Sequence, residues 1–257
     1  MERCWASVLG DCKGPLSDEH IITGGLFEDP MLKVSGFDWC NGAVREIPRD
    51  RLVRRILCKG HNGRLGEIDR TAIRAARVFD EWLRTENARR EVSTTPRRWS
   101  IARFEIDGRQ LERWLLKTMI NATYDKNSMI GPTAVEVGKP TEELVRIAYG
   151  LDSFADRRGL YILAAQGYTA NNTDRISLTP WGHDEFVNGM AINFRGFILM
   201  MCLISRGMDI QQALDMPLKA MDPEQKVDRM QLNPMRHPQA FISRQGKYVS
   251  SKITFKW

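Results

Sequence analysis

The sequence predicts a mixed α+β protein, in which a small N-terminal module held together by a metal precedes a larger α+β domain. Three observations predict this. Residues 1–64 hold four of the five cysteines and two of the four histidines, in short stretches punctuated by glycine and proline. From Leu65 onward, apolar residues recur every three or four positions, as on one face of a helix. The second half alternates helix-like segments with short apolar runs typical of strands.

The N-terminal part is expected to form short strands and loops. It is too sparse in apolar residues to fold well alone, so a bound metal would supply the missing stability. The amphipathic helix is expected to run from residue 65 to about residue 87, and residues 91–99 to form a linker, because Thr95-Pro96 breaks the helix. The expected division therefore places one unit at residues 1–95 and a second at residues 96–257.

The second unit is expected to begin with a helix over residues 107–124 and a shorter one over residues 139–150. In the shorter helix Thr141 can cap the start and Gly150 the end. Strands are expected where short apolar runs follow, at residues 159–166, 174–181, 186–194, 196–204 and 252–257.

Bulk composition restricts the class of protein. Hydrophobic content of 42% with 27% charged residues is typical of a globular chain. The N-terminus lacks the apolar core of a secretory signal, and the most apolar run, residues 194–204, is too short to span a bilayer. We therefore expect a cytoplasmic protein without membrane contact, in which the cysteines are metal ligands or buried thiols rather than disulfides.

Cys58 and His61 are separated by two residues, which is the spacing of a zinc knuckle. Cys4 and Cys12 would provide the other half of a tetrahedral Cys₃His site. Cys40 is an alternative fourth ligand in place of His61. The opposing interpretation is a set of small buried thiols and a surface histidine. Three cysteines and a knuckle-spaced histidine within about 60 residues favour a structural zinc site.

Two short motifs stand beside this set, "SDEH" at residues 17–20 and "LCKGHN" at residues 57–62. Together with the knuckle they resemble the HNH, or His-Me finger, nucleases, in which a two-stranded hairpin and a helix surround a metal. The resemblance covers residues 4 to about 75. It implies a zinc-containing ββα-metal module. The family's middle Asn, which braces the loop, has no counterpart, because Val53 stands at that place.

The resemblance also implies residue roles. His20 would be the general base that activates water. Glu19 and Asn62 would hold a catalytic Mg²⁺ or Mn²⁺, since carboxylate and amide oxygens suit these hard cations. By themselves the residues admit simpler interpretations: an acid-histidine pair is more often a surface feature, and an Asn at a helix start is more often a cap.

Basic residues concentrate near these motifs. Residues 42–103 contain 16 Lys or Arg against 8 Asp or Glu, in a chain of net charge +6. Such a field favours phosphate backbones, although an ordinary solvated face is the opposing interpretation. The expected DNA contacts are Lys59, Arg64, Arg70, Arg74 and Arg77.

The sequence thus predicts a DNA endonuclease of HNH type that needs zinc and a divalent ion, with a C-terminal domain that could receive a protein partner. The alternatives are a zinc-dependent module that binds nucleic acid without cutting it, and a structural adaptor. Nucleotide hydrolysis, dinucleotide binding and α/β-hydrolase chemistry lack support, because no Walker, GxGxxG or GxSxG motif occurs.

Overall fold

The computed structural model confirms a mixed α+β fold. It describes residues 4–35, 38–41, 43–92, 100–155, 158–165, 175–183, 185–204, 230–232, 240–245 and 248–257. Within these residues the α-helices are α1 (Lys59–Val92), α2 (Gly108–Thr123) and α3 (Glu142–Ala148). Four short 3₁₀ turns lie in the N-terminal part, at Ser7–Leu9, Gly24–Leu26, Asp38–Cys40 and Arg49–Arg51.

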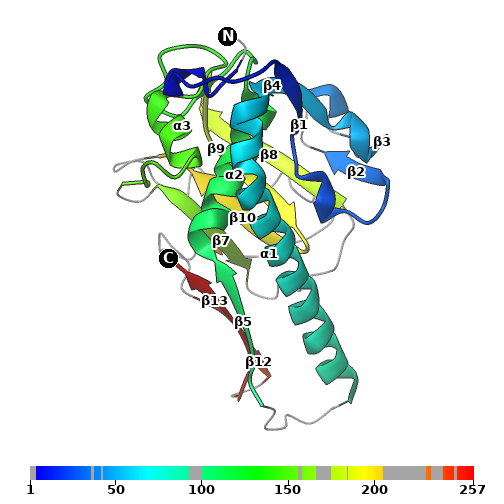
Figure 1. Ribbon diagram of the computed structural model, residues 1–257. Helices are drawn as coiled ribbons and strands as arrows, with labels where there is room; N and C mark the ends of the chain where they lie inside the picture. The colour runs from blue at the N-terminus through cyan, green and yellow to red at the C-terminus, as the bar shows by residue number, and fades with distance from the viewer. Residues whose placement is uncertain are drawn as a thin grey trace.

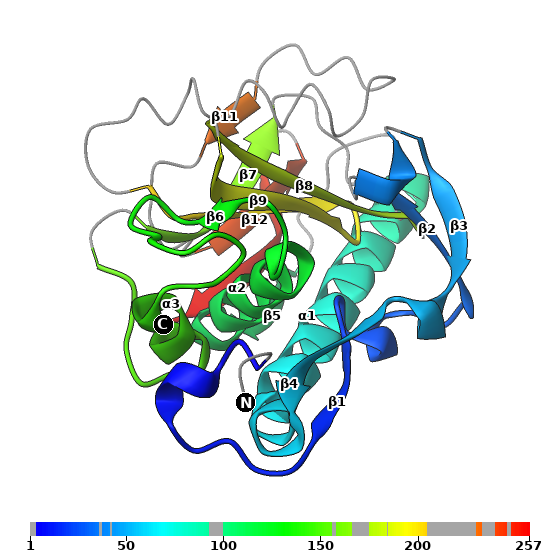
Figure 2. The ribbon, with the colours of Figure 1, turned by 90° about the horizontal axis from the view of Figure 1, so that it is seen from above.

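Two antiparallel strands lead directly into the longest helix. Strand β1 (Leu16–His20) pairs with β4 (Val53–Cys58), with Leu16 opposite Cys58 and His20 opposite Val53. The register shifts between Ser17 and Glu19. Helix α1 begins at the residue after β4, so both strands lie beside its first turns (Figures 1 and 2).

A large sheet joins strands from both halves of the chain. Its order is β11-β7-β10-β9-β8-β2-β3, and β6 pairs with β9 from outside this path. The strands are β2 (Met31–Ser35), β3 (Arg45–Pro48), β6 (Met129–Ile130), β7 (Gly159–Ala165), β8 (Arg175–His183), β9 (Phe186–Phe194), β10 (Phe197–Cys202) and β11 (Met230–Leu232). β2 runs parallel to β8, so the connection between β1 and β4 contributes two strands to this sheet.

A smaller sheet contacts α1 and α2 on the side of the molecule away from β1 and β4 (Figure 1). It has the order β12-β13-β5, made of Ala240–Gln245, Tyr248–Lys256 and Ala102–Asp107. β5 and β13 run parallel. Asp107 ends β5 and caps α2, because its side chain accepts a hydrogen bond from the Gln110 N–H at 3.0 Å.

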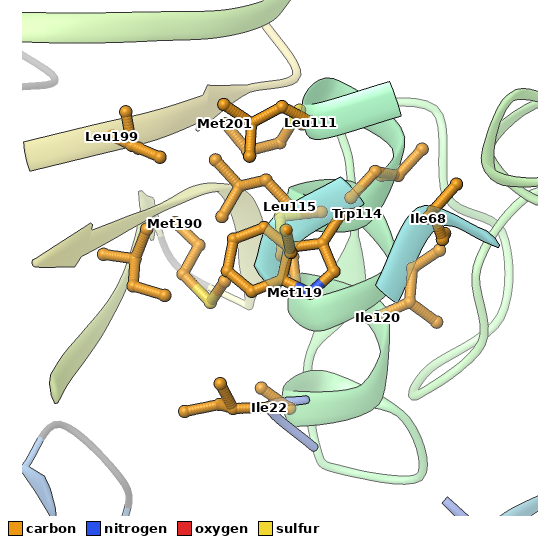
Figure 3. Packing of buried hydrophobic residues seen from close by; sticks show 14 of the residues in the cluster. Ile22, Ile68, Leu111, Trp114, Leu115, Met119, Ile120, Met190, Leu199 and Met201 are labelled. Atoms are coloured by element: carbon orange, nitrogen blue, oxygen red, sulfur yellow. The ribbon is translucent and has the colours of Figure 1, made fainter. Parts of the chain in front are cut away.

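Helices α1 and α2 lie on one face of the large sheet, and α3 packs against α2 (Figure 2). Helix α2 buries Leu115 and Met119 against Met190 and Met201 of β9 and β10, as Figure 3 shows. Helix α1 reaches the same sheet farther along, where the Phe79 ring stacks on Phe197 with 4.2 Å between ring centroids. Because α2 is buried along most of its length, it lies at the centre of the core.

The predicted elements agree well with the observed ones. The helices expected at residues 107–124 and 139–150 are α2 and α3, and Thr141 caps α3 as expected. The expected C-terminal strands are β7, β8, β9, β10 and β13. Helix α1 is longer than expected at both ends, starting at Lys59 and reaching Val92. Most of the expected linker, residues 93–99, lies outside the described residues.

The expected division near residue 95 separates segments that share one sheet and one hydrophobic core. Strands β2 and β3 precede it and pair into the sheet formed by β7–β10, and core residues of α1 and α2 contact each other. Among the described helices, none combines the length and the apolar character needed to cross a membrane.

Candidate functional site

Three cysteines and one histidine from distant parts of the chain meet at the start of α1. The sulfur atoms of Cys4, Cys12 and Cys58 lie 3.4, 3.5 and 3.1 Å from Nδ1 of His61. All four potential ligand atoms are within 4.8 Å of one another. Cys58 ends β4 and His61 lies in the first turn of α1, so the strand-to-helix junction supplies half of the set.

These separations fit a tetrahedral metal ion such as zinc. With Zn–S near 2.3 Å and Zn–N near 2.0 Å, a tetrahedron holds sulfur and nitrogen about 3.5 Å apart. The histidine completes the set, as the sequence predicted. The alternative ligand Cys40 lies elsewhere, since its thiol faces the carbonyl of Val34 at 3.9 Å. The Cys₃His cluster could therefore hold zinc without help from Cys40.

Burial and backbone hydrogen bonds shift the pKa values of the candidate ligands in different directions. Burial raises the pKa of the Cys4 thiol to about 12. Burial acts on Cys58 too, but hydrogen bonds from the backbone N–H groups of His61 and Lys13 outweigh it and lower the pKa of that thiol. Burial also lowers the pKa of His61, which favours the neutral ring that a metal ligand requires. Because metals bind thiolates, ion binding here would release thiol protons.

A second layer of residues orients the histidine. Nε2 of His61 lies 2.8 Å from Oδ1 of Asp11, which leaves Nδ1 turned toward the thiols. Arg64 holds the Asp11 carboxylate through two hydrogen bonds, at 2.8 and 3.2 Å, and its guanidinium lies 4.9 Å above the Tyr149 ring. The Tyr149 hydroxyl donates to the His61 carbonyl at 3.1 Å. A residue that follows α3 thus braces the candidate metal centre.

Asn62 is fixed against β1 by its amide nitrogen. Nδ2 lies 3.0 Å from Oγ of Ser17 and donates to the backbone carbonyl of Asp18 at 3.2 Å. A carbonyl only accepts hydrogen bonds, so the nitrogen of the amide must face Asp18. The Oδ1 atom therefore points elsewhere, and within the described residues it accepts no hydrogen bond. An amide oxygen with a fixed direction and no hydrogen bond from these residues is suited to bind a cation.

Glu19 is buried and faces α2. Its Oε1 atom forms an ion pair with Lys117 and accepts a hydrogen bond from Nδ2 of Asn121 at 3.1 Å. The same ammonium binds both carboxylate oxygens of Asp69 on α1, at 2.8 and 2.9 Å. Burial raises the pKa of Glu19, and the Lys117 charge opposes that rise. One lysine therefore joins carboxylates from β1 and α1.

His20 ends β1 and is half-buried. Its ring lies over Gly24, where an added Cβ would come 3.0 Å from Nε2, so a larger residue at position 24 would displace the imidazole. The His20 backbone carbonyl accepts a hydrogen bond from Asn121 at 3.1 Å. In the sequence, Val53 stands where the resemblance implies a bracing Asn. In the structure an amide from α2 holds this strand end.

We expect Lys117→Met to lower the free energy of unfolding by about 3–5 kcal/mol, because the buried carboxylate of Glu19 and the partly buried one of Asp69 lose their counter-ion. Urea titration measures this. Lys33→Met, which replaces an exposed lysine on β2, is the matched control and should leave the midpoint unchanged. An unchanged midpoint in Lys117→Met would show that the carboxylates do not need this ammonium.

The same variant should show a pH dependence of defined sign. Without Lys117 the main opposition to burial is lost and only the Asn121 hydrogen bond still opposes it, so the pKa of Glu19 in the folded state rises further above its ordinary value of 4.5. A group of this kind weakens the folded state as pH rises through the folded pKa, and costs nothing below the unfolded pKa. The deficit relative to wild type should therefore shrink on acidification from pH 7 toward pH 4.

The expected DNA-binding residues divide into two groups. Arg64 is paired with Asp11, while Arg70 and Arg74 both bind the Glu67 carboxylate, at 2.8 and 2.9 Å. Lys59 and Arg77 are exposed and form no ion pair within the described residues. Much of the positive charge along α1 is thus compensated locally.

Sequence reasoning missed Asp11, Asp69, Lys117, Asn121 and Tyr149. Lys117 and Asn121 did carry a signal, because a lysine and an asparagine stand on a helix otherwise rich in buried apolar residues. Such polar residues are rarely buried without a partner. Comparison of the chain with protein-family models, curated proteins and solved structures finds no match.

Proposed function

We propose that this protein is a metal-dependent DNA endonuclease of HNH type. The observation that carries the proposal is the placement of His20 and Asn62 around one strand-strand-helix unit. His20 ends β1, Asn62 lies in the first turn of α1, and the Asn62 amide is hydrogen-bonded to β1. The paired strands β1 and β4 are separated along the chain by β2 and β3, and α1 follows β4 directly, so the pair and the helix together match the two strands and helix that the resemblance implies.

His20 would act as the general base. Its ring is half-buried over Gly24 and has no hydrogen-bond partner within the described residues, so both ring nitrogens remain available. An imidazole takes up a proton near neutral pH, which suits removal of a proton from an attacking water. The strand and its hydrogen bond to Asn121 would hold the ring in place.

Asn62 and Glu19 would hold the catalytic ion. Within the described residues the amide oxygen of Asn62 accepts no hydrogen bond, and the ion pair and hydrogen bond of the Glu19 carboxylate both involve Oε1. Oε2 is thus the oxygen that Glu19 would offer. An amide and a carboxylate oxygen match the preferences of Mg²⁺ and Mn²⁺. When bound, such an ion supplies Lewis-acid stabilisation of the phosphate and of the leaving oxygen.

The Cys₃His cluster would have a structural role in this proposal. Its ligands come from the start of the chain, the end of β4 and the first turn of α1. A zinc ion there would fix the start of α1 against the strand end, and Asn62 directly follows the ligand His61. Cluster and catalytic residues therefore depend on the same junction but share no side chain.

A second candidate function is zinc-dependent binding of nucleic acid without cleavage. The Lys117–Glu19 ion pair favours it, because an ammonium already satisfies the carboxylate that the catalytic ion would need. Under this alternative the buried Glu19 and Lys117 and the partly buried Asp69 form an ionic group with a purely structural purpose.

Nicking of a supercoiled plasmid distinguishes the two candidates. Wild-type protein should nick the plasmid when Mg²⁺ or Mn²⁺ is added and should be inactive without added divalent ion. Asn62→Ala should need more Mn²⁺ for the same rate, because one ligand is lost. A plasmid that stays supercoiled under all ions, while gel shifts show binding, would establish the second candidate.

DNA affinity should fall steeply with salt, because exposed basic side chains displace counterions from the phosphates. The double variant Lys59→Gln/Arg77→Gln should reduce the slope of log K against log salt by about two, since each phosphate contact contributes about 0.9. The matched control is Arg70→Gln/Arg74→Gln, whose charges Glu67 already partly compensates. Its slope should change less. Equal changes of the salt slope in both variants would show that pairing with Glu67 does not determine which side chains contact the phosphates.

A further inference from the structure

Helix α2 presents three polar side chains to the end of β1 and the residues after it. Trp114, Lys117 and Asn121 are three and four residues apart, which places them along one face of the helix. All three are almost completely buried. Trp114 donates to Oγ1 of Thr23 at 2.9 Å, and Lys117 pairs with Glu19. We call these three residues the polar edge of α2.

Asn121 makes the closest contact with the proposed catalytic strand. Its Nδ2 donates to the backbone carbonyl of His20 and to Oε1 of Glu19, both at 3.1 Å. Both partners accept only, so the two N–H bonds of the amide have defined directions. Oδ1 in turn accepts a hydrogen bond from Nε1 of Trp5 at 3.1 Å. Three hydrogen bonds therefore fix the orientation of a fully buried amide.

The anchor lies at the place where His20 needs one. The strand ends at His20, and the imidazole itself has no hydrogen-bond partner within the described residues. Its position is therefore set by its backbone and by packing over Gly24. The carbonyl of His20 is held by Asn121, a residue 101 positions away. Moving that carbonyl would move the ring.

We propose that Asn121 is the positioning residue for His20, an inference that rests on the proposed nuclease function. The amide holds the catalytic strand end so that the imidazole stays at one fixed place over Gly24. It touches neither substrate nor metal. A displacement of about 1 Å can cost an enzyme roughly 100-fold in rate, so loss of the amide should slow cleavage strongly.

The test compares Asn121→Leu with Thr118→Val. Both changes remove a buried polar group from α2 with little change in volume, but Thr118 forms no hydrogen bond within the described residues. Under single-turnover conditions Asn121→Leu should cut plasmid DNA about 10- to 100-fold more slowly, with DNA affinity within twofold and zinc content unchanged. Thr118→Val should cut at nearly the wild-type rate. Equal rates for the two variants would overturn the proposal.

Trp5→Phe keeps the inference testable if Asn121→Leu does not fold. This change preserves the aromatic packing but removes the N–H that orients the Asn121 amide. Cleavage should slow by several-fold while the zinc content and the melting temperature stay near those of wild type. A wild-type rate in folded Trp5→Phe would contradict the positioning role.

A measurement without DNA or divalent ion separates this inference from the proposed function. The chain has four histidines, so the ring signals of His20 can be assigned by comparison with His20→Ala in an NMR spectrum. Wild type and Thr118→Val should show one sharp set, and Asn121→Leu a broadened or doubled set. If wild type fails to cut DNA but the spectra change as expected, the nuclease proposal falls and the positioning role stands. If the wild type cuts DNA but the spectrum of Asn121→Leu is unchanged, the nuclease proposal stands and the positioning role falls.

Discussion

His20→Ala should abolish measurable nicking of plasmid DNA while the protein keeps its fold, its zinc and its affinity for DNA. A positioned general base contributes about 10² to 10⁴-fold in rate. His20 belongs to neither the Cys₃His cluster nor the hydrophobic core, so its loss should leave both intact. Single-turnover cleavage, elemental analysis and gel shifts together measure the effect.

The control for His20→Ala is His183→Ala, the same substitution at the end of β8. It should cut at the wild-type rate. Divalent ions in excess should not rescue His20→Ala, because the imidazole would supply proton transfer rather than metal affinity. Cleavage at the wild-type rate by His20→Ala would show that the residues around β1 and Asn62 are not the active site, and would favour binding without catalysis.

Cys58→Ser should release the zinc and destabilise the N-terminal part of the molecule. The structural ion in isolated zinc-finger peptides contributes about 10–16 kcal/mol of binding free energy, and a cluster that links three separate segments should depend on its ion in the same way. We expect about one zinc per wild-type chain and little or none in the variant. Thermal denaturation should show a large fall in the melting temperature.

Cys40→Ser is the matched control for this prediction. Both cysteines are fully buried, and both variants exchange a thiol for a hydroxyl. Cys40 lies outside the cluster with its thiol facing the carbonyl of Val34, so Cys40→Ser should retain the zinc. Zinc loss in Cys40→Ser together with retention in His61→Ala would show that the fourth ligand is wrong. A folded wild type without zinc would refute the metal site itself.

Local sequence was sufficient for features that depend on neighbouring residues. The apolar period from Leu65 onward gave α1, and the Thr141 cap gave the start of α3, because side chains three or four apart lie on one helical face. The spacing of Cys58 and His61 identified half of the metal cluster for a similar reason. The strand-to-helix junction places a residue and its third successor side by side, whatever the rest of the chain does.

The start of α1 was less predictable than its middle. Sequence periodicity placed the first helical residues near Leu65, whereas the helix begins at Lys59. Residues 59–64 contain two glycines and lack an apolar stripe, so their own preference for helix is weak. The meeting of His61 with three cysteines, and of Asn62 with β1, gives this turn its contacts.

The sequence by itself thus determined the mixed α+β class, the helices with a strong apolar period, and the candidate metal ligands, with Cys40 left as an alternative to His61 that only the structure decided. Only the tertiary structure decided what surrounds the proposed catalytic strand. Lys117 meets Glu19 across 98 positions, and Asn121 meets His20 across 101. No period or spacing encodes such pairs, because they depend on how α2 packs against α1 and β1. A lysine or asparagine on a helix face that is otherwise apolar indicates a buried polar group, which needs a hydrogen-bond or ion-pair partner. The partner's identity follows only from the packing of the whole chain.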